Sequence, residues 1–177
     1  MRTVKAVHKA LYEPIGDLVT YKAMPTDSLP MNALDPFIFL NHHGWQEYLP
    51  KNRGLPFGPH PHRGFETVTF ILEGDLTHKD SSGANSTIRA GGVQWMTAGK
   101  GLIHAEVSSE QFKNMGGPLE ILQLWVNLPA KLKMAEPAYT GLQKEEIPSI
   151  VLDNGKVTLH LVSGEWNGSK GPVQPLT

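Results

Sequence analysis

Two short pairs of metal-ligand residue types constrain this chain more than any other feature of its sequence. His60 and His62 form the first pair, and His104 and Glu106 form the second, each with one residue between its members. Side chains two residues apart on a β-strand point to the same face, so each pair can direct two ligands at one point. Imidazole nitrogens and a carboxylate oxygen suit a divalent first-row transition metal. The pattern therefore predicts a mononuclear metal site carried on strands, with coordination positions left open for chemistry.

In the rest of the chain, glycines and prolines divide the sequence into short segments, as is typical of an all-β protein. The chain contains 18 glycines and 14 prolines in 177 residues, and few of the short segments between them show an apolar period of 3.6 residues. We expect a long loop over 41–59, a helical turn within 108–116 and a hairpin at Asn154-Gly155. Strands are predicted from β-branched and aromatic runs at 36–40, 67–73, 76–80, 86–90, 93–97 and 119–127.

A second carboxylate competes for the metal. Glu66 shares parity with His60 and His62 if one strand runs unbroken through all three positions. Its other expected roles are a hydrogen bond that orients a ligating histidine and an ion pair with Arg63. Parity alone therefore leaves both Glu66 and Glu106 open as the carboxylate ligand.

The other histidines receive no metal role. His42 and His43 are adjacent, so on an extended chain at most one of them can point inward. His78 and Asp80 precede the turn residues 81–83, and we expect them to stabilise that hairpin turn. His160 lies on a strand that is distant in sequence from both pairs.

Composition excludes several functions. The chain has no cysteine, which rules out disulfides, thiolate catalysis, iron–sulfur clusters and cysteine-ligated zinc. A net charge of −1 provides no bulk attraction to nucleic acid or to anionic lipid. The first twenty residues lack the apolar core of a signal peptide, and no run is long enough to span a bilayer. We expect a cytoplasmic protein that binds neither nucleic acid nor membranes directly.

Two blocks of sequence resemble the pirin family of the cupin superfamily: 59–74, Pro-His-Pro-His-Arg-Gly-Phe-Glu-Thr-Val-Thr-Phe-Ile-Leu-Glu-Gly, and 91–106, Gly-Gly-Val-Gln-Trp-Met-Thr-Ala-Gly-Lys-Gly-Leu-Ile-His-Ala-Glu. Gly54 precedes the His-x-His pair as in cupins generally. Gly99 stands where cupins usually have proline, and this departure is the pirin form. The resemblance implies a cupin antiparallel β-barrel or jelly roll, with the metal inside near one mouth. Its ligands would be His60, His62, His104 and Glu106, which favours Glu106 over Glu66.

The resemblance also suggests how the chain is divided. We expect a segment over 1–34 that packs on the barrel, a pirin-type metal-binding domain over 35–165 and a linker-like tail over 166–177. Pirins generally carry a second cupin half, and this chain stops where that half would begin. It is expected to be either a single-cupin relative or a fragment. A fragment should form a two-fold homodimer.

For function, the resemblance implies a quercetin 2,3-dioxygenase-like enzyme that cleaves flavonoid-type substrates with O2. Fe(II) is the expected metal, with Ni, Cu, Mn, Co and Zn as alternatives. Glu106 would accept the proton of the substrate hydroxyl. Trp45, Tyr48 and Phe57 are expected either to line an aromatic pocket or to plug the barrel mouth. The alternative function is a non-enzymatic, iron-dependent regulatory protein that binds a protein partner.

Overall fold

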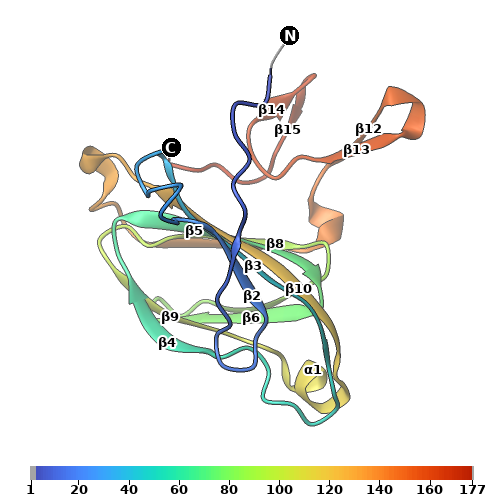
Figure 1. Ribbon diagram of the computed structural model, residues 1–177. Coiled ribbons are helices and arrows are strands. Elements are labelled where there is room, and N and C mark those ends of the chain that lie inside the picture. Colours follow the sequence, from blue (N-terminus) through green and yellow to red (C-terminus); the bar gives the residue numbers. More distant parts are fainter. Residues whose placement is uncertain (1–2, 177) are drawn as a thin grey trace.

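The computed structural model describes residues 3–176 and contains two packed antiparallel sheets (Figure 1). The larger sheet has the strand order β1-β2-β3-β10-β5-β8-β11, and the smaller has the order β4-β9-β6-β7. Neighbours in both orders are mostly distant in sequence, which is the connectivity of a jelly roll rather than of simple hairpins. The predicted all-β jelly-roll class is confirmed.

The larger sheet consists of β1 (Leu11–Tyr12), β2 (Thr20–Met24), β3 (Phe37–Tyr48), β5 (Phe65–Glu73), β8 (Val93–Thr97), β10 (Gly117–Asn127) and β11 (Ala138–Leu142). The smaller sheet consists of β4 (Phe57–His62), β6 (Asp75–Asp80), β7 (Asn85–Arg89) and β9 (Leu102–Val107). Two separate hairpins follow, formed by β12 (Ser149–Leu152) with β13 (Val157–His160) and by β14 (Glu165–Trp166) with β15 (Ser169–Lys170). The described helical segments are α1 (Glu110–Met115), η1 (Ala130–Leu132), η2 (Lys144–Glu146) and η3 (Asp153–Gly155).

The two local turn predictions are confirmed. Helix α1 lies within 108–116 and begins where the Ser109 side chain accepts a hydrogen bond from the Phe112 backbone N–H. Strands β12 and β13 pair around the predicted Asn154-Gly155 hairpin. Both turn residues have positive φ, 54° and 89° respectively, which asparagine and glycine tolerate better than other residues.

The predicted loop over 41–59 is wrong in its first half. Strand β3 continues through Tyr48, and only the residues between it and β4, 49–56, connect the two strands. The continuation pairs with β2 on one side and β10 on the other, so its backbone hydrogen bonds are satisfied inside the sheet. Its inward-facing side chains include the polar Asn41 and His43, both buried. The polar interior hides the apolar alternation that normally identifies a strand.

Successive side chains of β5 point alternately into the interior of the sandwich and toward the outer face of the larger sheet. Thr69 hydrogen-bonds to Glu106 on β9 of the opposite sheet, so Thr69 points inward and Val68 points outward. Apolar side chains fill the end of the interior nearest α1, where the cluster contains Leu18, Leu55, Ile71, Leu76, Ile88, Phe112, Leu119 and Ile121. The rest of the interior contains buried polar side chains, together with a small apolar cluster of Met96, Ala98 and Leu102. The site is therefore set in a polar chamber closed at one end by an apolar core.

Both terminal segments contact the larger sheet. Strands β1 and β2 extend its edge beyond β3. The C-terminal segment, red in Figure 1, covers part of the outer face, where Val173 is 4% exposed and packs in one cluster with Val68 and Val126. The division at 34 and 165 stays a prediction, and residues 1–2 and 177 of its end segments lie outside the described residues. Within 3–176, no helix is long and apolar enough to cross a membrane.

Two glycines with positive φ, Gly99 in the turn between β8 and β9 and Gly64 in the turn between β4 and β5, allow a test of stability. A Cβ on Gly99 would lie 2.1 Å from the Ala135 backbone oxygen, whereas a Cβ on Gly64 would meet only the Lys133 side chain at 3.6 Å. We expect Gly64→Ala to lower the unfolding free energy by about 1–2 kcal/mol through the backbone alone. Gly99→Ala should cost roughly 1–3 kcal/mol more, because its neighbour is backbone and must move. Equal losses in denaturant titrations would contradict this account of the turn.

Candidate metal centre

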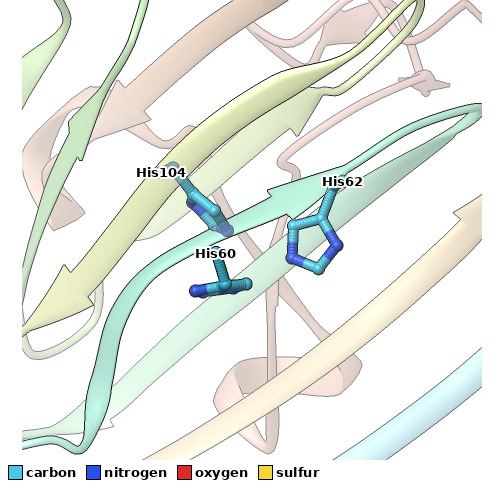
Figure 2. A group of neighbouring side chains, drawn as sticks. All are labelled: His60, His62 and His104. Atoms are coloured by element: carbon cyan, nitrogen blue, oxygen red, sulfur yellow. The ribbon is translucent and has the colours of Figure 1, made fainter.

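Three histidines converge inside the sandwich (Figure 2). His60 and His62 project from β4 and His104 from β9, and His60 is the register partner of His104 across the two strands. One ring nitrogen of each lies within 4.8 Å of the others. His62 and His104 are buried, and His60 is half-buried. The spacing of two residues within β4 places its two rings on the same face, as predicted.

Hydrogen bonds leave nitrogen lone pairs at this cluster. His60 Nδ1 lies 2.7 Å from the Gly58 carbonyl oxygen, which can only accept, so His60 carries its proton on Nδ1 and keeps a lone pair on Nε2. His104 Nε2 is buried and has no hydrogen-bond partner among residues 3–176. A buried polar atom left without a partner is costly. A bound cation would satisfy it, so the residues present fit a divalent metal ion.

The surroundings keep two of these rings neutral. Burial, reinforced by the neighbouring His60, lowers the pKa of His62 to about 4. Burial lowers the pKa of His104 to about 3, with smaller effects of the same sign from His60, His62 and His78. Neutral imidazole is the form that binds a metal. The two buried rings therefore need not release a proton to become ligands at neutral pH.

Glu106 lies on the interior face of β9 but outside the group of three. Its side chain is fully buried, and the carboxylate accepts hydrogen bonds from Thr69 at 3.2 Å, from Gln123 at 2.7 Å and from Gln94. Burial raises the pKa of Glu106, while the three donors and His60 act in the opposite direction. The structure thus brings three of the four expected ligands together. The metal-binding and catalytic roles of Glu106 stay predictions.

Glu66 lies on the opposite face of its sheet. It is fully buried, and its carboxylate accepts a hydrogen bond from Thr97 Oγ1 at 2.7 Å. The parity argument assumed an unbroken strand, but β4 ends at His62 and β5 begins at Phe65. Between them Gly64 has a φ of 81°, and this turn resets which residues face inward. The expected ion pair with Arg63 does not form, because Arg63 Nη2 donates to Met134 Sδ instead.

His78 lies beside the histidine cluster, and its contact with His104 is one that the sequence analysis did not predict. Asp80 does stabilise the hairpin turn, since its Oδ1 accepts from the Ser82 N–H, the Ser82 hydroxyl and the Ala84 N–H. His78 instead points into the interior, fully buried, with Nδ1 3.4 Å from His104 Nδ1. Its ring stacks on Tyr139 with centroids 3.9 Å apart. His78 and Asp80 have the same two-residue spacing as the metal-ligand pairs, and this was the signal for a shared face.

His42 and His43 alternate as expected. His42 Nε2 contacts Glu120 at 2.8 Å on the partly exposed face. His43 is 1% exposed and pairs through Nδ1 with Thr20 Oγ1 at 2.9 Å. Burial lowers the pKa of His43 to about 4, with a smaller contribution from His42. Neither ring belongs to the group of three histidines.

The aromatic side chains beside the cluster differ from those expected. Phe65 and Trp125 both lie 5.1 Å from the His62 ring and stack on each other at 4.7 Å. Tyr48 and Phe57 pack against the apolar core and so plug the sandwich, while Trp45 is 59% exposed. A surface hollow of about 490 Å³ reaches His62 and is lined by Pro61, His62, Arg63, Ser81, Gly101, Leu102 and Ile103.

Comparisons with known proteins place the site in a family. A family model described as Pirin matches residues 18–126. A Pseudomonas aeruginosa protein named "Putative quercetin 2,3-dioxygenase" is 42% identical over 160 residues, which are 90% of this chain and 54% of that protein. Pirin-1 of Arabidopsis thaliana is 44% identical over 149 residues, covering 84% of this chain and 47% of its own. The chain spans about half the length of these curated relatives.

A crystal structure of a quercetin 2,3-dioxygenase from Acinetobacter baumannii has the same fold. Its TM-score is 0.81 at 38% identity, and the match covers 96% of this chain and 62% of that one. The likeness therefore extends beyond the two histidine-bearing blocks to nearly all of the present chain.

Because His43 is buried, we expect the free energy of unfolding to decrease in acid. The unfolded imidazole takes up a proton below its usual pKa of about 6.5, whereas folded His43 does so only near 4. The unfolded state thus binds more protons between these values, and the unfolding free energy should fall as pH drops from 6.5 to 4, by on the order of 3 kcal/mol from this residue. Denaturant titrations of His43→Gln should show a shallower dependence. Exposed His160 supplies the control, because His160→Gln should retain the wild-type slope; identical slopes in all three proteins would refute the prediction.

Proposed function

The chain belongs to the pirin family, and we propose that it forms the metal-binding part of a quercetin 2,3-dioxygenase-like enzyme. The observation that supports this most is the convergence of His60, His62 and His104, together with the buried Nε2 atom of His104, which has no hydrogen-bond partner among residues 3–176. Relatives named as quercetin 2,3-dioxygenases supply the reaction class. Because those proteins are longer than this chain, the whole activity is part of the proposal.

The proposed ligands are the three histidines together with Glu106, and the proposed metal is Fe(II). Imidazole suits several first-row metals, so nickel, copper, manganese, cobalt and zinc remain alternatives that the ligand set would accept. Glu106 is two residues from His104 on β9 and faces the same interior. To bind a metal, the Glu106 carboxylate would have to give up some of its hydrogen bonds from Thr69, Gln94 and Gln123 and coordinate the ion instead.

The metal, when bound, would lower the pKa of a coordinated substrate hydroxyl and stabilise the resulting anion. Glu106 would receive that proton. Its buried carboxyl has a raised pKa, which makes it a stronger base than an exposed glutamate. Gln94 and Gln123 would hold the carboxyl in place in both protonation states, because each amide can donate to it.

The proposed substrate is a flavonol-type planar aromatic, with O2 as the second reactant. The stacked rings of Phe65 and Trp125 next to His62 support this choice, because aromatic faces and edges favour contact with another ring. Trp125 also stacks on Phe39, at 4.2 Å. These three rings form one continuous aromatic wall on β3, β5 and β10.

The metal assignment is tested by His62→Ala. This variant removes a ligand without touching the apolar core at the α1 end, so we expect the protein to stay folded by circular dichroism and to lose stoichiometric metal. His160→Ala is the matched control, since His160 is exposed on β13 and, among residues 3–176, its side chain hydrogen-bonds only to Ser149. Elemental analysis after Fe(II) loading should show about one metal per chain for the wild type and the control. Full occupancy in His62→Ala would overturn the assignment.

The catalytic proposal is tested by Glu106→Gln. The variant keeps three histidines and an amide oxygen but lacks the base, so metal should be retained while turnover falls by roughly 10²–10⁴-fold. Iron-loaded protein would be mixed with quercetin without oxygen, and carbon monoxide would be measured after oxygen is admitted. Unchanged release by the variant would remove Glu106 as the base. No release by the iron-replete wild type would contradict the dioxygenase proposal itself.

A further inference from the structure

We propose that His78 and Asp80 are positioning residues that fix the ring tautomer of His104, so that its Nε2 faces the cluster with a free lone pair. This inference rests on the proposed metal site and assigns a role to two residues that do not belong to it. The three side chains form a continuous chain of contacts across β6 and β9, where Asp80 is the register partner of His104.

Asp80 determines where His78 carries its proton. Its Oδ1 is occupied by three donors from the hairpin turn, at 2.8 Å, 2.7 Å and 3.1 Å. Oδ2 is left to contact His78 Nε2 at 2.8 Å, and both side chains are fully buried. An ionised carboxylate can only accept hydrogen bonds. The proton of His78 therefore sits on Nε2, and in the neutral ring its Nδ1 is an acceptor.

His78 in turn determines the tautomer of His104. The two Nδ1 atoms are 3.4 Å apart, and an acceptor on His78 requires a donor on His104. His104 then carries its proton on Nδ1 and presents the Nε2 lone pair to the cluster. The reverse arrangement would place a proton on His104 Nε2, which is buried and has no acceptor among the described residues. A cationic His78 would force the same unfavourable arrangement.

Neighbouring side chains hold His78 in place between Asp80 and His104. Tyr139 covers the His78 ring in a nearly parallel stack, with an interplanar angle of 12°, and its hydroxyl is fixed by Ser86 at 2.6 Å. His60 reaches the same tautomer by a simpler route, through the carbonyl of Gly58. Hydrogen-bond partners that fix the tautomer of a ligating histidine typically change metal affinity by 10–100-fold when they are removed.

Asp80→Asn should exchange the donor and acceptor roles in the Asp80–His78–His104 contacts, with little change in side-chain shape. All three turn contacts of Oδ1 are with donors, so the asparagine oxygen must remain there and its NH2 group must face His78. His78 would then accept on Nε2 and donate from Nδ1, which would leave the proton of His104 on Nε2. We expect Co(II) affinity to fall about 10–100-fold. His78→Asn, whose Oδ1 can take the place of the Nδ1 acceptor, should bind Co(II) more tightly than His78→Leu.

Ser82→Ala is the matched control for the turn. It removes one hydrogen bond from Asp80 Oδ1 but leaves Oδ2 on His78, so it should loosen the hairpin without changing Co(II) affinity. Thermal unfolding of every variant separates affinity from folding. Wild-type affinity in a folded Asp80→Asn protein, or an equal loss in Ser82→Ala, would overturn the proposal.

The tautomer is read directly in the metal-free full chain. Long-range ¹H–¹⁵N correlation spectra of the histidine rings, assigned with His104→Gln, should show the Nδ1–H form of His104 in the wild type and the Nε2–H form in Asp80→Asn. An Nε2–H wild-type ring would refute the positioning role. Failure of the wild type to bind Co(II) would instead contradict the proposed metal site, and the ring spectra would still decide the tautomer.

Discussion

The site depends on the pairing of β4 with β9, because that pairing places His60 opposite His104. Each strand contributes side chains at two-residue spacing, so one register brings imidazoles from residues more than forty positions apart to one point. A slip of one residue would turn the side chains of one strand to the outer face. Close to the site, the Gly64 N–H donates to the Gly99 carbonyl oxygen at 2.8 Å, which joins the turn after β4 to the turn before β9.

A second consequence of this geometry is a polar interior. Placing ligands inside the sandwich means that their neighbours must satisfy buried charges and lone pairs, and the structure meets this demand in two ways. The buried carboxylate of Glu106 is surrounded by amide and hydroxyl donors. The His104 ring is contacted by His78, which is anchored in turn on a carboxylate whose pKa is held at about 2: burial acts to raise it, but hydrogen bonds from His78, Ser82 and Ala84 outweigh that effect.

The sequence predicted what depends on local spacing and missed what depends on contacts between distant strands. The shared face of His60 and His62, helix α1 and the 153–156 turn follow from patterns within a few residues. The continuation of β3 from Asn41 through Tyr48 could not be recognised, because its polar inward residues are buried by partners on other strands. The contact between His78 and His104 could not be predicted, because the two residues lie 26 positions apart along the chain. Parity leaves Glu66 open as a ligand because the turn at Gly64, which changes the inward-facing face, cannot be recognised from the spacing.

The proposed metal centre requires that three imidazoles of this chain bind one metal ion. X-ray absorption spectroscopy of the Zn(II)-loaded chain tests it most directly, because imidazole rings give a distinctive multiple-scattering pattern. We expect one tightly bound zinc with three imidazole nitrogens at about 2.0–2.1 Å and an oxygen as the remaining ligand. A first shell of oxygen without imidazole scattering would contradict it.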